Sequence, residues 1–440
     1  MKLKTKNFNW HAGRPVVFLN EEVATKMNVF VDDRVAITNS KKIYAIVDIF
    51  SKLVKKNQIG ISHELNRILK LKSGSIVEVS ASEISDASFL IKKKLNGGTL
   101  SEKDLSFIVS EIVHNNLTEA EIAFFTSAQK LNGMKFKETI NLTKAMVKTG
   151  ARLKFKGKYV ANKHCIGGVA GNRTTPIVIA ICASLGIKLP KTSSRAITSA
   201  SGTADVIETI ANVEISLKKI ATGAKYILID IPYGHGAKVK DLASAKRLGR
   251  KFHKIAKHFK LKMKVIYTDG TQPIGDGFGP VLEMLDIIEV FKNNGPQDLK
   301  EKSIYLATEL IKLCGIKNAK TKATESLESG KAYEKFKEII NAQNGKKNFN
   351  NKLKELKLAK FKKIIPAQKS GNITTIDNKG INSLCRILGT PETIAAGVYL
   401  HKHLEKIKKG EPLITLYSES RTKMKDAIKF LEEFKPIQIK

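Results

Sequence analysis

A glycine-rich segment near the middle of the chain contains residue types that bind anions. It reads Lys163-His-Cys-Ile-Gly-Gly-Val-Ala-Gly-Asn-Arg-Thr-Thr-Pro176 and leads directly into an apolar run long enough for a helix. Its glycines let the backbone approach a ligand closely, and Thr174 and Thr175 bring hydroxyl and N–H groups to the positive end of that helix. Neither a GKS or GKT ending nor GxGxxG spacing is present. The pattern predicts an oxyanion site, with a tight structural turn as the alternative.

A second segment, Thr192-Ser-Ser-Arg-Ala-Ile-Thr-Ser-Ala-Ser-Gly-Thr-Ala-Asp205, surrounds one arginine with seven hydroxyl side chains. Hydroxyl groups and a guanidinium fork suit phosphate or ribose oxygens, and Arg195 offers a planar, bidentate contact that lysine cannot make. The same residues are typical of a polar loop whose Ser and Thr side chains cap a helix starting near Ala204. Both interpretations stay open from the residues alone.

Two further glycine-rich turns follow expected strands. They are Asp230-Ile-Pro-Tyr-Gly-His-Gly236 and Asp269-Gly-Thr-Gln-Pro-Ile-Gly-Asp-Gly-Phe-Gly279. Ligands of open α/β sheets gather at the carboxyl ends of strands, so carboxylates and imidazoles here are candidates for acid–base chemistry. Turn formation and loop hydrogen bonding are the commoner roles of these residue types. The candidates are Asp230, Asp269, Asp276, His164 and His235.

These loops need a framework of strands and helices, and the residue patterns predict one. Short β-branched runs come first, followed by helical periodicity with capping boxes at Ser101 and Thr118. Strands and helices then alternate, and short strands return after a Lys- and Asn-rich stretch. The sequence predicts a multidomain α/β and α+β protein: a small β-rich N-terminal domain at 1–84, a helical domain at 85–157, a central α/β phosphate- and nucleotide-binding domain with a mainly parallel sheet at 158–341, a linker at 342–363 and a small α+β C-terminal domain at 364–440.

Composition narrows the class of protein. The chain has 440 residues, of which 42% are hydrophobic and 27% charged, which excludes wholesale disorder and a collagen-like fibre. The longest mainly apolar run, Ile177 to Ile187, is too short to span a membrane. Four scattered cysteines predict neither a disulfide framework nor a zinc site. We expect a cytoplasmic protein that has no metal, no cofactor and no membrane partner.

The charge balance is strongly basic, with 77 Lys and Arg residues against 41 Asp and Glu and a formal net charge of +36. Only ten of the basic residues are arginine, and the lysines are spread along the whole chain. Proteins that read nucleic acid tend to concentrate arginine and aromatic residues on one face. The charge therefore does not by itself predict a nucleic-acid partner, although it would attract anionic substrates.

At these loops the chain resembles the thymidine and pyrimidine-nucleoside phosphorylase family, in particular its archaeal-type AMP phosphorylase branch. The similarity extends over nearly the whole chain and includes the N-terminal extension typical of that branch. The matching segments are Lys163-His164-x-Ile-Gly167-Gly168-Val169, Lys191 to Asp205, Ile229-Asp-Ile-Pro-Tyr-Gly-x-Gly-Ala-Lys-Val239 and Thr268-Asp-Gly-x-Gln-Pro-Ile-Gly275.

The resemblance implies a phosphorolytic pentosyltransferase of nucleotide salvage. In such an enzyme, inorganic phosphate attacks the ribose C1′ of a nucleoside 5′-monophosphate, which is AMP or also CMP or UMP, and releases free base and ribose 1,5-bisphosphate. Phosphate is a co-substrate, no cofactor is implied, and helical domains pair the subunits into a homodimer or a larger homo-oligomer. The implied phosphate-binding residues are Lys163, His164, Gly167, Thr174 and Thr175, and the implied substrate-binding residues are Gly168, Ser194, Arg195, Ala196, Ile197, Thr198, Ser199 and Thr203.

The chain departs from this family where the catalytic acid is expected. Only Val213 to Lys225 connect a helix to the next strand, whereas relatives insert some dozens of residues that carry the proposed proton-donating aspartate and two nucleotide contacts. Asn162 and Cys165 also replace the usual Asp and Ser beside the Lys-His pair. The candidate catalytic acid is therefore His164, with a carboxylate from elsewhere in the chain as the alternative. The alternatives are a thymidine or pyrimidine-nucleoside phosphorylase and a non-catalytic relic that still binds nucleotide or phosphate.

Overall fold

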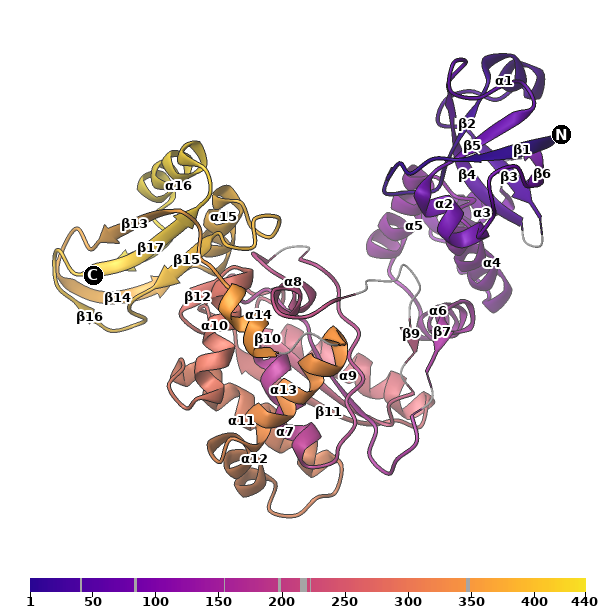
Figure 1. Cartoon of the computed structure of the whole chain (residues 1–440). Helices are drawn as coiled ribbons and strands as arrows, with labels where there is room; N and C mark the ends of the chain where they lie inside the picture. The colour runs from indigo at the N-terminus through magenta and orange to yellow at the C-terminus, as the bar shows by residue number, and fades with distance from the viewer. Residues whose placement is uncertain are drawn as a thin grey trace. The chain divides into compact units, whose positions relative to one another are not determined.

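The computed structural model describes residues 1–39, 42–82, 85–153, 155–196, 199–213, 220–221, 223–345 and 349–440. These residues form two compact units, and Figure 1 shows their elements along the chain. The first unit comprises residues 1–151 with the short strand β9 (Ile220–Ala221), which pairs with β7 (Ala151–Arg152). The second unit comprises the other described residues. Within the described residues, no helix combines the length and apolar character needed to cross a membrane.

The first unit begins with a closed six-stranded barrel whose strands pair in the order β1-β5-β2-β4-β3-β6. In β1 and β6 alternate side chains are buried, as the two-residue period of a strand requires, so Leu3, Val77 and Val79 lie in the barrel core. The elements are β1 (Lys2–Asn7), β2 (Val16–Leu19), α1 (Glu21–Met27), β3 (Arg34–Thr38), β4 (Lys42–Ile49), β5 (Gln58–Ile61), α2 (His63–Leu69) and β6 (Ile76–Ala81).

Four helices complete the first unit. They are α3 (Asp86–Leu95), α4 (Glu102–Val113), α5 (Glu119–Asn132) and α6 (Phe136–Thr149). Capping boxes at Ser101 and Thr118 begin α4 and α5, which confirms both predicted helix starts. A buried ion pair joins α3 to α6, because Nζ of Lys94 lies 3.0 Å from Oε1 of Glu138 and both side chains are at most 4% exposed.

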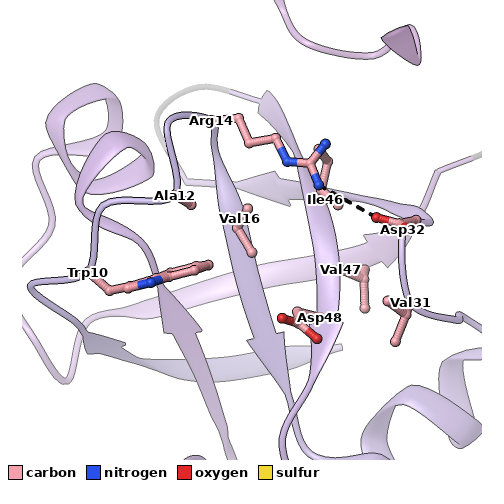
Figure 2. Close-up of a pocket in the computed structure, with 9 residues that line it drawn as sticks. All are labelled: Trp10, Ala12, Arg14, Val16, Val31, Asp32, Ile46, Val47 and Asp48. Carbon is pink, nitrogen blue, oxygen red and sulfur yellow. Dashed lines mark ion pairs between the residues drawn. The ribbon is translucent and has the colours of Figure 1, made fainter. Parts of the chain in front are cut away.

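A cavity of about 230 Å³ lies in the first unit beside β2 and β4. Trp10 and Asp48 are among the residues that line it (Figure 2). Arg14 points toward Asp32, with Nη2 3.7 Å from Oδ1, and its Nη1 lies 3.5 Å from Oε1 of Glu119 at the start of α5. This arginine therefore links the barrel to the helices of the same unit.

A parallel sheet of three strands supports the α/β part of the second unit. Its order is β11-β10-β8, formed by β8 (Ala161–Cys165), β10 (Tyr226–Tyr233) and β11 (Lys262–Asp269). Helix α7 (Thr174–Ser184) is nearly all buried, because it packs against both α11 (Gln297–Leu313) and α13 (Lys331–Asn344), as Figure 1 shows. Its sequence is correspondingly apolar on all sides. The other helices are α8 (Thr203–Glu208), α9 (Leu242–His258), α10 (Pro280–Phe291), α12 (Ala319–Glu328) and α14 (Phe349–Glu355).

The segment predicted as a linker, 342–363, contains regular structure. It holds the end of α13, all of α14 and the start of β13 (Phe361–Pro366). Phe349 is only 1% exposed, and its ring packs edge-on against the rings of Tyr333 and Phe336. One aromatic side chain thus anchors α14 in the core although Lys and Asn dominate its surroundings in sequence.

The C-terminal part of the second unit has two antiparallel sheets, in the orders β12-β15-β17-β13 and β16-β14-β18. Helix α15 (Asn378–Leu388) packs on them with a buried face that includes Ile381, Leu384 and Leu388. The remaining elements are β12 (Gly277–Phe278), β14 (Gly371–Ile376), β15 (Gly397–Leu400), β16 (Lys406–Ile407), β17 (Pro412–Ser418), α16 (Arg421–Phe434) and β18 (Ile437–Ile439).

Candidate functional site

The glycine-rich segment 163–175, here called the anion loop, leaves the carboxyl end of β8 and enters α7. Gly168 has a φ of +99°, and a Cβ at this position would lie 2.4 Å from the backbone nitrogen of Lys238. Gly171 has a φ of +65°, and its Cβ would lie 2.1 Å from the carbonyl oxygen of Ile274. Only glycine fits either place, so the turns that follow β10 and β11 pack directly against the anion loop.

Lys163 is buried inside the anion loop, with an exposed fraction of 1%. Its Nζ donates hydrogen bonds to Oγ1 of Thr174 at 2.9 Å and to Oγ1 of Thr175 at 3.1 Å. Burial lowers the pKa of Lys163, and the carboxylate of Asp230 partly opposes that shift. The structure therefore brings three of the predicted phosphate-binding residues together at the start of α7.

Asp230 is fully buried and places a carboxylate near Lys163 and Lys302. Its Oδ1 accepts a hydrogen bond from the Thr268 hydroxyl at 2.7 Å, and its Oδ2 lies 3.7 Å from Nζ of Lys302 in α11. Burial raises the pKa of the nearby Cys165 thiol, and its Sγ accepts from Nδ2 of Asn172 at 3.5 Å. Cys165 is therefore a neutral thiol that is engaged inside the loop.

His164 is exposed to solvent, but the protein around its ring lowers its pKa. Burial, with the charges of Lys191 and Lys163, lowers the pKa of His164 to about 4. Burial, with the charge of Lys163, also lowers the pKa of Lys191 to about 8. At neutral pH the ligand-free site therefore combines a neutral imidazole with two lysines, which is an arrangement that favours an anion.

The segment 192–205, here called the nucleotide loop, is closed by one buried carboxylate. Asp205 is 3% exposed and its Oδ2 accepts from the backbone N–H of Ala196 at 2.7 Å and of Gly202 at 2.6 Å. Its Oδ1 accepts from Nη1 of Arg195 at 3.3 Å. Nη2 of Arg195 also donates to Oε1 of Glu208 at 2.9 Å, so the predicted substrate-binding guanidinium already has two acidic partners.

The other predicted residues of the nucleotide loop differ in their surroundings. Ser199 donates its hydroxyl to the carbonyl oxygen of Ser201 at 2.7 Å, whereas Ser194 is exposed. Thr203 is the first residue of α8, which begins close to the predicted place, but the N-cap is Gly202 and no described Ser or Thr side chain caps this helix, so the helix-capping interpretation is wrong. The predicted contacts Ile197 and Thr198 lie outside the described residues.

The remaining candidates from the sequence have partners of their own. Asp269 accepts from the backbone N–H of Thr271 at 2.9 Å, in the manner of a turn. Asp276 accepts from Nε2 of His403 at 2.9 Å, and Nδ1 of His235 lies 4.0 Å from Asp377. Among the described residues, no group of three or more His, Cys, Asp or Glu side chains is placed to hold a metal ion.

Several residues that shape the site were missed by sequence reasoning. Lys191 lies beside Lys163 and His164. The carboxylate of Asp205 accepts a hydrogen bond from the nucleotide loop, and the carboxylate of Glu283 forms an ion pair with Arg173 of the anion loop. Asp205 follows the start of α8 at the third position, where acidic residues are favoured. Glu283 interrupts the apolar run Pro-Val-Leu-Glu-Met-Leu, and a carboxylate in such a run indicates a buried partner.

Comparisons with known proteins match two parts of the chain to one family. A family model described as the helical bundle domain of a glycosyl transferase family matches residues 89–150, and one for the a/b domain of that family matches residues 157–224. The second match ends within the short connection between α8 and β10.

Curated relatives extend the similarity to the full chain. AMP phosphorylase of Thermofilum pendens is 34% identical over 489 residues, covering 100% of this chain and 95% of the relative. AMP phosphorylase of Pyrococcus furiosus is 35% identical, covering 100% and 98%. A putative thymidine phosphorylase of Legionella pneumophila is 32% identical, covering 96% and 92%. With this identity over nearly the full length of both partners, the chain belongs to the thymidine and pyrimidine-nucleoside phosphorylase family, together with the AMP phosphorylases.

Proposed function

We propose that this chain is an AMP phosphorylase-like enzyme that converts a nucleoside 5′-monophosphate and inorganic phosphate to free base and ribose 1,5-bisphosphate. The observation that carries the proposal is the buried side chain of Lys163, whose Nζ donates hydrogen bonds to the hydroxyls of Thr174 and Thr175 at the positive end of α7. The full-length relatives named AMP phosphorylase support AMP as the first nucleotide to test.

The chemistry that this site offers is the positioning of two anions. In the proposed complex the anion loop holds the nucleophilic phosphate, and the nucleotide loop holds the nucleotide. These anions repel each other in water. Burial lowers the pKa of Lys163 and Lys191 in the ligand-free site, whereas a bound anion favours their charged forms. A phosphate fixed near C1′ also stabilises the oxocarbenium character that develops there, so orientation accounts for much of the expected rate enhancement.

The departing base needs a proton, and His164 is the proposed donor. Its imidazole is neutral at pH 7 in the ligand-free protein because its pKa is about 4. A phosphate dianion bound in the adjacent loop would raise this pKa, since negative charge stabilises the imidazolium. We therefore propose that His164 acquires its proton only after phosphate binds.

A non-catalytic relic is the second candidate, and the length of the chain favours it. The comparison with the Thermofilum relative runs over 489 residues, against the 440 residues of this chain, so that relative has residues without a counterpart here. The family match to the α/β domain also ends at residue 224, inside the shortened connection. A relic of this kind would bind phosphate and AMP through the retained loops and release no base.

Base release separates the two candidates. Purified protein is incubated with AMP, CMP, UMP, adenosine or thymidine, with and without phosphate, and free base is measured by chromatography. Phosphate-dependent release from AMP, lost in Thr174→Val, would establish the enzyme, because this variant keeps the side-chain shape and removes one partner of Lys163. Release from thymidine alone would indicate a nucleoside phosphorylase. A melting temperature raised by AMP without base release would identify the relic.

We also propose a homodimer as the smallest assembly, formed through the helices of the first unit. Exposed apolar side chains gather on these helices: Phe89 on α3 is 68% exposed, and Phe124 and Leu131 on α5 are 55% and 78% exposed. Phe124 and Leu131 are seven residues apart and share one face of α5. The four free cysteines suit a reducing compartment, and we place the protein in the cytoplasm.

A further inference from the structure

The anion loop and the nucleotide loop are joined by a buried guanidinium. Arg173 is the last residue before α7 and is only 9% exposed. Its Nη2 donates a short hydrogen bond to the carbonyl oxygen of Ser201 in the nucleotide loop. The side chain therefore starts in one loop and ends on the backbone of the other.

A buried carboxylate completes this connection from a third segment. Glu283 in α10 is 1% exposed and forms an ion pair with Nε of Arg173. Its Oε1 accepts from the hydroxyl of Ser201 and from the backbone N–H of Gly279 at 3.2 Å. One carboxylate thus holds both the arginine of the anion loop and the serine of the nucleotide loop.

The hydrogen bonds to Ser201 and Gly279 are directional, and the ion pair between Arg173 and Glu283 joins them, which distinguishes this cluster from ordinary core packing. A buried ion pair adds little stability compared with apolar side chains of similar volume, because the charges lose their hydration. Removing one partner, however, leaves an unpaired buried charge and releases the groups that it oriented. A connection of this kind is suited to fixing geometry, and here it fixes the distance between two loops that each receive an anion.

We propose that Arg173 and Glu283 are positioning residues that hold the anion loop and the nucleotide loop in the mutual geometry needed to bind phosphate and nucleotide. Neither side chain needs to touch a ligand. The inference rests on the proposed function, because it assumes that the two loops take phosphate and AMP. It predicts that breaking the pair weakens both ligands together, since the pair belongs to both loops.

The test measures dissociation constants for inorganic phosphate and for AMP by calorimetry. Glu283→Gln keeps the side-chain size and removes the charge, and we expect both dissociation constants to rise about tenfold or more. Arg173→Lys keeps a cation beside Glu283 but cannot make both contacts of the guanidinium, so we expect both dissociation constants to rise together, by less than in Glu283→Gln. Should Glu283→Gln fail to fold, Ser201→Ala is the second variant. It removes only the hydroxyl that donates to Glu283, and it should raise both dissociation constants.

A matched control separates positioning from stability. Lys94→Met breaks the buried pair Lys94–Glu138 in the other unit, so it should lower the melting temperature and leave both dissociation constants unchanged. Wild-type affinity in Glu283→Gln or Ser201→Ala, or equal loss of affinity in Lys94→Met, would overturn the inference. Absence of phosphate and AMP binding in the wild type would instead refute the proposed function, and the inference with it.

Discussion

His164 is exposed, yet its surroundings lower its pKa well below the ordinary value of 6.5. We expect its imidazole to titrate near pH 4 in the ligand-free protein, because burial, Lys191 and Lys163 all disfavour the charged ring. Phosphate should raise this pKa, since an anion in the adjacent loop favours the imidazolium. NMR of the histidine rings, with His164→Asn to assign the signal, measures both values. An ordinary titration near 6.5 that phosphate does not move would contradict the arrangement of these residues.

The same shift predicts how stability depends on pH. Because the pKa of His164 is lower in the folded state than its ordinary value of 6.5, the unfolded chain binds the proton more readily between these values. The contribution of the neutral ring is complete above about pH 6.5 and is lost as the pH falls toward 4. Urea midpoints at pH 7, 5 and 4 should therefore fall more steeply for the wild type than for His164→Asn. Parallel curves would exclude the shift.

In the proposed complex Glu208 competes with the nucleotide for Arg195, so its removal should strengthen binding. Glu208→Gln frees the guanidinium from one of its two carboxylates, and we expect the dissociation constant for AMP to fall about threefold, as suits an exposed ion pair. The control is Glu289→Gln, which breaks the exposed pair with Lys292 at 2.8 Å in the same unit and should change nothing. Weaker AMP binding in Glu208→Gln would show that Glu208 orients Arg195 for the ligand.

The residue types of both loops could be predicted from the sequence, because glycine, threonine and arginine at close spacing carry the chemistry locally. The partners of these residues could not be predicted from the sequence. Arg195 meets carboxylates 10 and 13 residues further along the chain, and Arg173 meets Glu283 from a different helix. Such pairs depend on how elements pack, and an isolated segment contains no signal for that. The sequence likewise contains no signal for the surrounding protein that lowers the pKa of His164.

At the scale of elements, the turn into α7 depends on glycine for two separable reasons. Gly168→Ala introduces a side chain at a φ of +99° and a Cβ 2.4 Å from the backbone nitrogen of Lys238. Gly186→Ala, just after the same helix, has a φ of +80° and open space around the new Cβ. We expect Gly186→Ala to cost about 1 kcal/mol of unfolding free energy. Gly168→Ala should cost clearly more and abolish phosphate binding, as thermal unfolding and calorimetry would show. Equal costs would mean that the loop adapts.

Strong local patterns made several elements predictable. The capping boxes at Ser101 and Thr118 are present, and the β-branched runs expected at the start of the chain include the strands β3 and β6. Strand β1 was missed because it reads Lys-Leu-Lys-Thr-Lys-Asn, and lysines hide the alternation that buries Leu3 and Thr5. The barrel then closes through pairings of β1 with β5 and β6, far apart in sequence, which no local pattern specifies.

At the scale of the molecule, the apolar face of α5 should control the oligomeric state. We expect Leu131→Glu to convert a dimer to a monomer, because a charge would be buried in the proposed interface. Light scattering after size-exclusion chromatography measures the mass. Leu404→Glu, at a side chain 48% exposed in the other unit, is the control and should leave the mass unchanged. A dimer that survives Leu131→Glu would place the interface elsewhere.

Trp10 is the only tryptophan of the chain, and it belongs to the first unit, beside the barrel cavity, with its ring 5.1 Å from that of Phe18. All the residues proposed to bind phosphate or nucleotide belong to the second unit. Indole fluorescence therefore reports on a unit that contributes none of the residues proposed to bind phosphate or nucleotide. An emission change on adding AMP would be an optical sign that the barrel senses events in the other unit. Constant emission would make this indole an internal reference for quantitative titrations.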